Sequence, residues 1–223
     1  MYPHGPIYCE TGHPWLFMAE PVNTLTNGFI ILAAILAYLH VRRARVGFSS
    51  DLSVLLILLM VNGIGSTLWH GLRTNWALQL DWIPGVLFLF VLTGAWMRQL
   101  FGRVAGFAGP ALMLAAAVGG VWLMLLFGGG LPRTLMFVPA FATTALIALV
   151  MVLATAPKFG AGAASLGALS LMFAVAAAVF RSIDLMTCDL IPFGTHFLWH
   201  LGLSTAAYLG IVLLVKMKKA NRE

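Results

Sequence analysis

The stretch LSVLLILLMVNGIGSTLW, residues 52–69, is apolar at nearly every position in its first half and carries no charge at all. About 20 such residues in a helix span a hydrocarbon core of about 30 Å. A transmembrane strand would be shorter and would alternate polar with apolar side chains. A helix also satisfies its own backbone hydrogen bonds, as a membrane-spanning segment must. The stretch therefore predicts a transmembrane helix.

Apolar stretches of similar length recur along the chain and predict an all-α fold, a seven-transmembrane helix bundle. The breaks between them carry charges, Pro or Gly, as in RRAR at 42–45 and GGGLPR at 128–133. The expected spans are residues 23–39, 52–69, 77–97, 107–127, 135–154, 164–180 and 197–215. No internal repeat is evident, so residues 1–223 are expected to form a single membrane domain.

The composition agrees with a membrane protein. Of the 223 residues, 61% are hydrophobic and 9% are charged, whereas a soluble domain carries about 25% charged residues. A net charge of +6 would indicate nucleic-acid binding if the basic residues covered one folded face. They lie in the short breaks and at the C-terminal end instead, so no nucleic-acid partner is expected.

The distribution of Lys and Arg predicts the orientation of the bundle. One alternate set of breaks, together with the C-terminal end, holds Arg42, Arg43, Arg45, Arg98, Arg103, Lys158, Lys216, Lys218, Lys219 and Arg222. The opposite set holds only Arg73, Arg133 and Arg181. Residues 1–21 are therefore expected outside the cytoplasm, and residues 216–223 as a basic cytoplasmic tail. The expected location is a bacterial inner membrane or a eukaryotic endomembrane.

Both cysteines fall on the side that this orientation places outside the cytoplasm. Cys9 lies in the N-terminal segment, and Cys188 precedes the last span. Because disulfides persist in non-cytoplasmic compartments, a Cys9–Cys188 bridge is predicted. Two buried free thiols are the alternative.

A few polar residues lie within the expected spans, where ionisable groups are costly and are candidates for function. Ser66 and His70 are near the end of the second span, and Asp81 is near the start of the third. His196 and His200 open the seventh span. Since residues at i and i+4 share a helix face, and all three span ends lie on one side of the membrane, these groups are expected at one depth.

Three imidazoles with an open fourth position are typical of a catalytic zinc site. Zinc lowers the pKa of a bound water to about 7. Asp81 is then expected to orient or deprotonate that water, and Ser66 to hydrogen bond to the water or to a developing oxyanion. A single buried histidine more often only packs, so the hypothesis rests on the set. His4, His13 and His40 are given no metal role.

The order of these residues resembles that of the alkaline ceramidases, within a superfamily that includes the adiponectin and progestin receptors. The matching positions are Glu10, Glu20, Asn23, Ser66, His70, Asp81, Cys188, His196 and His200. The resemblance implies a zinc-dependent amide hydrolase that cleaves ceramide or a related N-acyl lipid into a long-chain base and a fatty acid. It assigns zinc to the three histidines, water activation to Asp81, and a place beside the metal to Ser66. It also implies the disulfide.

The N-terminal segment departs from that family. Animal alkaline ceramidases place a calcium site there, with an Asp-Trp-x-Glu-x-Asn run and a later Glu. Residues 7–12 of this chain read IYCETG, so Glu10 and Glu20 are the remaining carboxylates. Calcium takes six to eight oxygen ligands, and backbone carbonyls would have to complete a site here.

Two other functions use the same histidines. A receptor-like, non-catalytic protein would hold a structural zinc and bind a membrane lipid in its cavity. A haem-binding membrane subunit would use paired histidines as axial ligands. Turnover of a lipid amide and the identity of the bound metal distinguish the three.

Overall fold

The computed structural model describes residues 7–10, 18–127, 135 and 137–222. Within these residues the regular elements are all helical, and seven helices are long and apolar enough to cross a membrane. The prediction of an all-α bundle with seven spans is therefore confirmed, and the chain is a multi-pass membrane protein. Which end faces the cytoplasm stays a prediction.

The helices run further than the sequence pattern suggested. Their bounds are α1 Pro21–Thr26, α2 Gly28–Ala44, α3 Ser50–Leu72, α4 Asn75–Phe101, α5 Arg103–Phe127, α6 Val138–Phe159, α7 Ala161–Ile183 and α8 His196–Ala220, with a short 3₁₀ helix, η2, at Asp184–Met186. Charged residues at the helix ends do not stop the helices, because long basic side chains reach the interface while their stems stay apolar. Most of the expected tail is thus the last turn of α8.

Single glycines separate two pairs of helices. Gly102 lies between α4 and α5, and Gly160 lies between α6 and α7, with φ of 90° and 80°. Glycine adopts positive φ at no steric cost, so each chain reversal needs only one residue. These connections are shorter than the breaks that the charges and prolines indicated.

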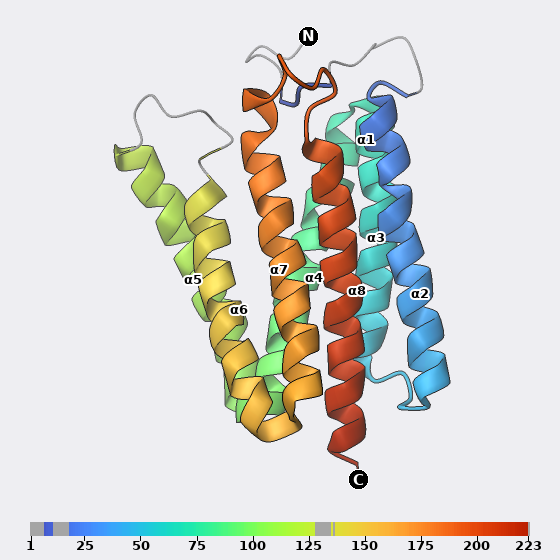
Figure 1. Cartoon of the computed structure of the whole chain (residues 1–223), viewed down its shortest axis with the longest axis vertical. Coiled ribbons are helices and arrows are strands. Elements are labelled where there is room, and N and C mark those ends of the chain that lie inside the picture. Colours follow the sequence, from blue (N-terminus) through green and yellow to red (C-terminus); the bar gives the residue numbers. More distant parts are fainter. Residues whose placement is uncertain (1–6, 11–17, 128–134, 136, 223) are drawn as a thin grey trace.

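The seven long helices run side by side (Figure 1), and their contacts close them into a ring. Each helix from α2 to α7 packs against the next one in the sequence, and α8 closes the ring against α2. The helix α4 also contacts α6 and α8 across the ring. In this arrangement α5 and α6 lie on the opposite side of the bundle from α2.

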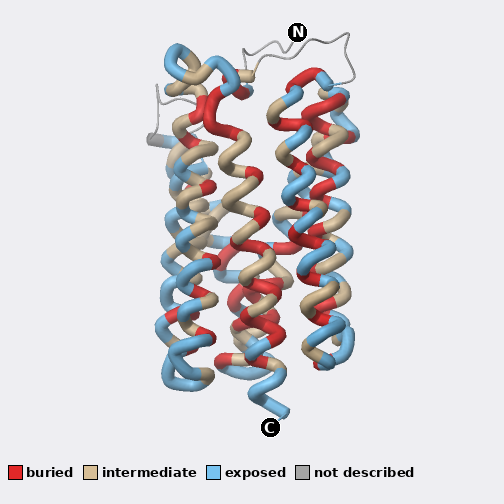
Figure 2. Tube along the Cα trace, turned by 45° about the vertical axis from the view of Figure 1, so that its right-hand side comes forward, coloured by how far each residue is buried: buried red, intermediate tan, exposed pale blue. Residues whose placement is uncertain are grey.

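Burial differs strongly between the helices (Figure 2). Half of the most apolar window is buried in α3 and in α8, against 11% in α5. The two most buried helices, α3 and α8, are thus the ones that carry the three histidines. We call the end of the bundle with the last turn of α3 and the first turns of α4 and α8 the histidine end. The opposite end, with the first turn of α3 and the last turns of α4 and α8, is the basic end.

Candidate metal centre

The structure brings the three predicted histidines together at the histidine end. His70 lies in the last turn of α3, and His196 and His200 lie in the first two turns of α8. One ring nitrogen from each lies within 4.8 Å of the other two. The ring centroids are 4.8 to 5.2 Å apart, and all three side chains are buried. One ion could contact all three rings at once.

A buried carboxylate orients the first ring. The Nδ1 atom of His70 lies 2.5 Å from Oε2 of Glu20, and Arg73 lies 2.9 Å from the other oxygen of Glu20. The ring therefore donates its Nδ1 proton to Glu20, which leaves Nε2 as the basic nitrogen. That Nε2 is buried and has no hydrogen-bond partner among the described residues. A carboxylate behind a histidine is the usual support of a metal ligand.

A threonine orients the ring of His200 in a similar way. Its Nδ1 lies 2.9 Å from Oγ1 of Thr26, and that hydroxyl donates to the carbonyl of Val22 at 2.8 Å. Because the hydroxyl proton is already used, the oxygen of Thr26 accepts from Nδ1 of His200. The Nε2 atom of this ring is then the nitrogen with a free lone pair.

The third ring lies beneath the N-terminal segment. The ring centroid of Tyr8 is 3.9 Å from that of His196 and 5.2 Å from that of His70. Burial, with a smaller contribution from the negative charge of Asp81, raises the pKa of Tyr8 to about 12. Tyr8 is therefore a neutral phenol that covers the cluster from the N-terminal side.

The donor set suits a metal ion. Two ring nitrogens of the cluster, Nε2 of His70 and Nδ1 of His196, are buried without a hydrogen-bond partner in the described part of the chain. A buried polar atom left unpaired costs about 1–3 kcal/mol, and a bound cation would offset that cost. Three imidazole nitrogens favour zinc or another borderline transition metal over calcium or magnesium.

Ser66 and Asp81 lie beside the histidines, as their spacing predicted. Ser66 is buried one turn before His70 in α3. The hydroxyl of Ser66 and the ring of His70 are both close enough to the carboxylate of Asp81 to act on it electrostatically. The amide of Asn62 also donates to the backbone carbonyl of Asp81.

A close contact between α3 and α4 holds Asp81 in place. A Cβ atom at Gly65 would overlap the backbone carbonyl of Leu80. That carbonyl receives no helical hydrogen bond, because the residue four positions later is Pro84, which has no backbone N–H. The two helices therefore approach at Gly65, and this places Asp81 next to Ser66.

Asp184 is a residue that the sequence analysis missed. Its side chain is 1% exposed, and Oδ1 accepts from the backbone N–H of Thr195 at 2.6 Å and of His196 at 2.8 Å. Its Oδ2 accepts from the backbone N–H of Cys9 at 3.0 Å. The carboxylate thus fixes the start of α8, where a negative charge is favourable. Its signal in the sequence is weak, because it precedes the helix by 12 residues.

The disulfide between Cys9 and Cys188 is present, which confirms that prediction. It fastens the N-terminal segment to the loop before α8. The candidate calcium carboxylates have protein partners. Glu10 accepts from the backbone N–H of Val22 and Asn23, at the start of α1, at 2.8 and 2.9 Å. The calcium site stays a prediction.

Arg181 also lies near the metal centre, although the sequence analysis treated it only as a charge in a break between spans. The guanidinium of Arg181 lies 5.0 to 5.9 Å from the ring centroids of Phe137, Phe141 and Trp199. Its charge acts on Asp81 and on His196. His40 lies in α2, outside the cluster, and His4 and His13 lie outside the described residues.

Comparison with known proteins identifies one family. A family model described as Ceramidase matches residues 8–223, which is nearly the whole chain. The match spans every residue of the metal centre described above. No curated protein sequence gives a significant match.

Proposed function

The chain belongs to the ceramidase family, and from this premise we propose that it is a zinc-dependent intramembrane amide hydrolase. Its substrate is ceramide or a related N-acyl lipid, which it cleaves into a long-chain base and a fatty acid. The observation that carries the proposal is the cluster of three buried histidines, whose ligand nitrogens lie within 4.8 Å of one another.

His70, His196 and His200 would hold the zinc and leave a fourth position open. A zinc ion there would supply a Lewis acid that polarises a carbonyl and lowers the pKa of water. Glu20 and Thr26 hold two of the rings from behind, at 2.5 and 2.9 Å. The open position distinguishes this set from a structural site, which four protein ligands close.

Asp81 would act as the general acid–base. Its carboxylate accepts a proton from the attacking water as the water oxygen bonds to the amide carbon. It returns that proton to the amide nitrogen as the C–N bond breaks, so the base leaves as a neutral amine and the acyl group as a fatty acid. Such a group contributes about 10²–10⁴-fold to a rate. The hydroxyl of Ser66 is close to this carboxylate and would orient it.

The lipid class follows from the family and from the membrane location. An N-acyl lipid lies in the bilayer with its amide near the head groups, and the histidine cluster lies in the end turns of α3 and α8. The bias of basic residues supports a non-cytoplasmic location of that end. The substrate would then reach the centre from the leaflet on that side.

Metal content and turnover of the purified full chain in lipid nanodiscs test the proposal. The wild type is expected to hold one zinc and to hydrolyse a ceramide with a labelled acyl chain. His200→Ala should lose both zinc and activity, whereas His40→Ala, which changes a histidine outside the cluster, should keep both. Asp81→Asn should keep the zinc and lose activity about 10²–10⁴-fold.

Two results would overturn the proposal. Full turnover by Asp81→Asn would remove the acid–base role. A zinc-loaded wild type that hydrolyses no member of a panel of N-acyl lipids would favour the receptor-like alternative. A Soret absorption band without zinc would favour haem.

A further inference from the structure

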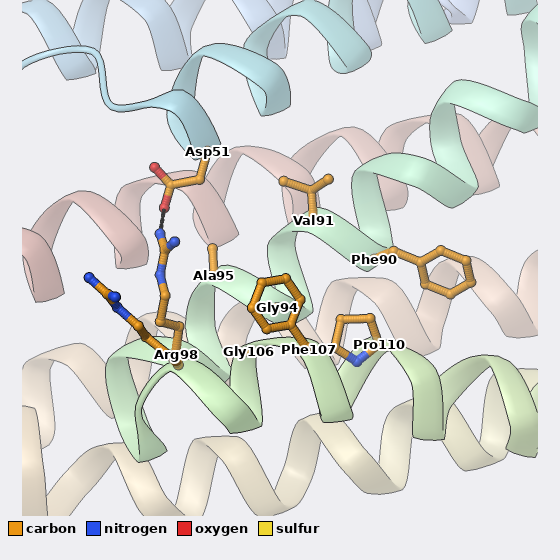
Figure 3. A pocket seen from close by; sticks show the side chains of 10 residues that line it. Asp51, Phe90, Val91, Gly94, Ala95, Arg98, Gly106, Phe107 and Pro110 are labelled. Atoms are coloured by element: carbon orange, nitrogen blue, oxygen red, sulfur yellow. Dashed lines mark hydrogen bonds and ion pairs between the residues drawn. The ribbon is translucent and has the colours of Figure 1, made fainter.

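A cavity lies at the basic end of the bundle (Figure 3). It has a volume of about 590 Å³ and lies between α3, α4 and α5. One part of its lining is charged, with Asp51, Arg98 and Arg103, and the rest is mostly apolar. None of these residues has a part in the proposed hydrolysis.

The charged part of the cavity has an excess of positive charge. The carboxylate of Asp51 lies 2.6 Å from the guanidinium of Arg98 and 2.9 Å from the amine of Lys218. One negative charge thus faces two positive ones. Arg103 adds a third and has no ion-pair or hydrogen-bond partner among the described residues. The nearby Lys158, by contrast, already donates to the carbonyls of Gln99 and Leu100.

The apolar part of the cavity continues from the charged part along α4 and α5. Figure 3 shows Val91 and Phe90 on one side, with Phe107 and Pro110 on the other. Phe107 is 81% exposed, so it faces the surrounding medium, which is lipid for a spanning helix. The two helices meet closely here, since a Cβ atom on Gly94 would lie 2.7 Å from the carbonyl of Gly106.

A ligand for this cavity must therefore combine an anionic group with an apolar chain. Arginine binds phosphate oxygens in a bidentate manner, and basic residues near a membrane surface attract anionic lipids. We propose that the cavity binds an anionic phospholipid, with its phosphate on Arg103 and on the exposed face of Arg98, and with one acyl chain along Val91 and Phe107. The proposal does not depend on the hydrolase activity.

Native mass spectrometry of the full chain, released from detergent with defined lipids, tests this site. Phosphatidylglycerol should be retained at a lower concentration than phosphatidylcholine. Arg103→Gln should weaken the binding of phosphatidylglycerol about fivefold, as expected for one basic residue near the surface, and Arg103→Lys should restore most of it. Lys219→Gln removes the same charge from an exposed position at the same end and should have no effect.

Two further measurements separate the parts of the ligand. Val91→Trp fills the apolar part without a change of charge and should also weaken phosphatidylglycerol binding. Free glycerol phosphate should not compete, because it lacks the acyl chain. Equal retention of both lipids, equal losses in Arg103→Gln and Lys219→Gln, or full competition by glycerol phosphate would overturn the proposal. Unchanged metal content in every variant shows that each is folded.

Discussion

The two ends of the bundle bury different chemistry. At the histidine end, the interior holds ionisable and polar side chains such as Glu20, His70 and Asp184, each with 1% or less of its surface exposed. At the basic end the interior is apolar, with Leu52, Leu55 and other aliphatic residues. Asp51 is buried there, but it pairs with Arg98, which has 43% of its side chain exposed.

This difference indicates that the histidine end is suited to a reaction and the basic end to binding at the surface. Buried charges are costly unless they are paired, and electrostatic interactions are stronger where water is excluded. The histidine end therefore needs exact partners for each group, and gains a reactive centre from them. The basic end needs few such partners, because solvent and lipid head groups screen its charges. Substitutions at the two ends should thus have different consequences.

The largest effect is expected from the carboxylate that anchors α8. Asp184→Ala leaves the N–H groups of Cys9, Thr195 and His196 without their acceptor. Each buried donor left unpaired costs about 1–3 kcal/mol, so the loss of three acceptors should lower the free energy of unfolding by at least about 3 kcal/mol. Chemical unfolding in detergent measures it. Asp189→Ala, an exposed position in the same loop, is the control, and equal effects of the two would contradict the anchoring role.

The disulfide should contribute nearly as much to the free energy of unfolding. The bridge between Cys9 and Cys188 closes a loop of 179 residues, and loss of a native bridge costs about 2–5 kcal/mol. The double variant Cys9→Ala/Cys188→Ala should unfold at a lower temperature than the oxidised wild type. A reductant should lower the wild type to the same temperature and leave the double variant unchanged. A shift of the double variant by reductant would show that another group is responsible.

Glu20, the carboxylate that accepts from His70, should affect the affinity for the metal. Glu20→Gln keeps the size of the side chain but weakens its bond to Nδ1 of His70, and changes of this type lower metal affinity about 10–100-fold. Competition with a zinc chelator measures the affinity. Glu10→Gln serves as the control, since Glu10 caps α1 and forms no hydrogen bond with the three histidines of the cluster. Calcium analysis of both variants also tests the calcium prediction. If Glu10 and Glu20 bind calcium, each variant should hold less calcium than the wild type.

The contact between α3 and α4 should influence turnover more than metal binding. In Gly65→Ala, the new methyl group meets the carbonyl of Leu80 and moves Asp81 away from Ser66. A displacement of this kind is expected to lower kcat about tenfold or more, with zinc content unchanged. Gly119→Ala adds a methyl group in open space. If both variants lower kcat equally, the position of Asp81 is not the cause.

The smallest effect is expected at the basic end. Asp51→Asn removes the negative charge beside Arg98 and Lys218 but keeps an oxygen that can accept from Lys218, while the more exposed Arg98 can turn to solvent. Ion pairs with an exposed partner are worth about 1 kcal/mol or less. The free energy of unfolding should change by no more than that, with zinc content and turnover unchanged. Loss of zinc in this variant would show that the two ends are coupled.

The sequence alone determined the class of fold, the candidate ligands and the pair of cysteines. Each depends on a local property: apolar length, helical spacing at i and i+4, and charge bias between adjacent spans. These properties do not need the rest of the chain. The spans themselves were recovered, although their ends were placed too early where basic residues occur, as at Lys216.

Only the tertiary structure decided what supports those ligands. Glu20 lies 50 residues from His70 in the sequence, Thr26 lies 174 residues from His200, and Asp184 lies 175 residues from Cys9. The contact of Gly65 with Leu80 depends on how two helices pack. No local pattern marks such pairs, because each exists only after the helices have closed into a ring and excluded water from the polar groups between them.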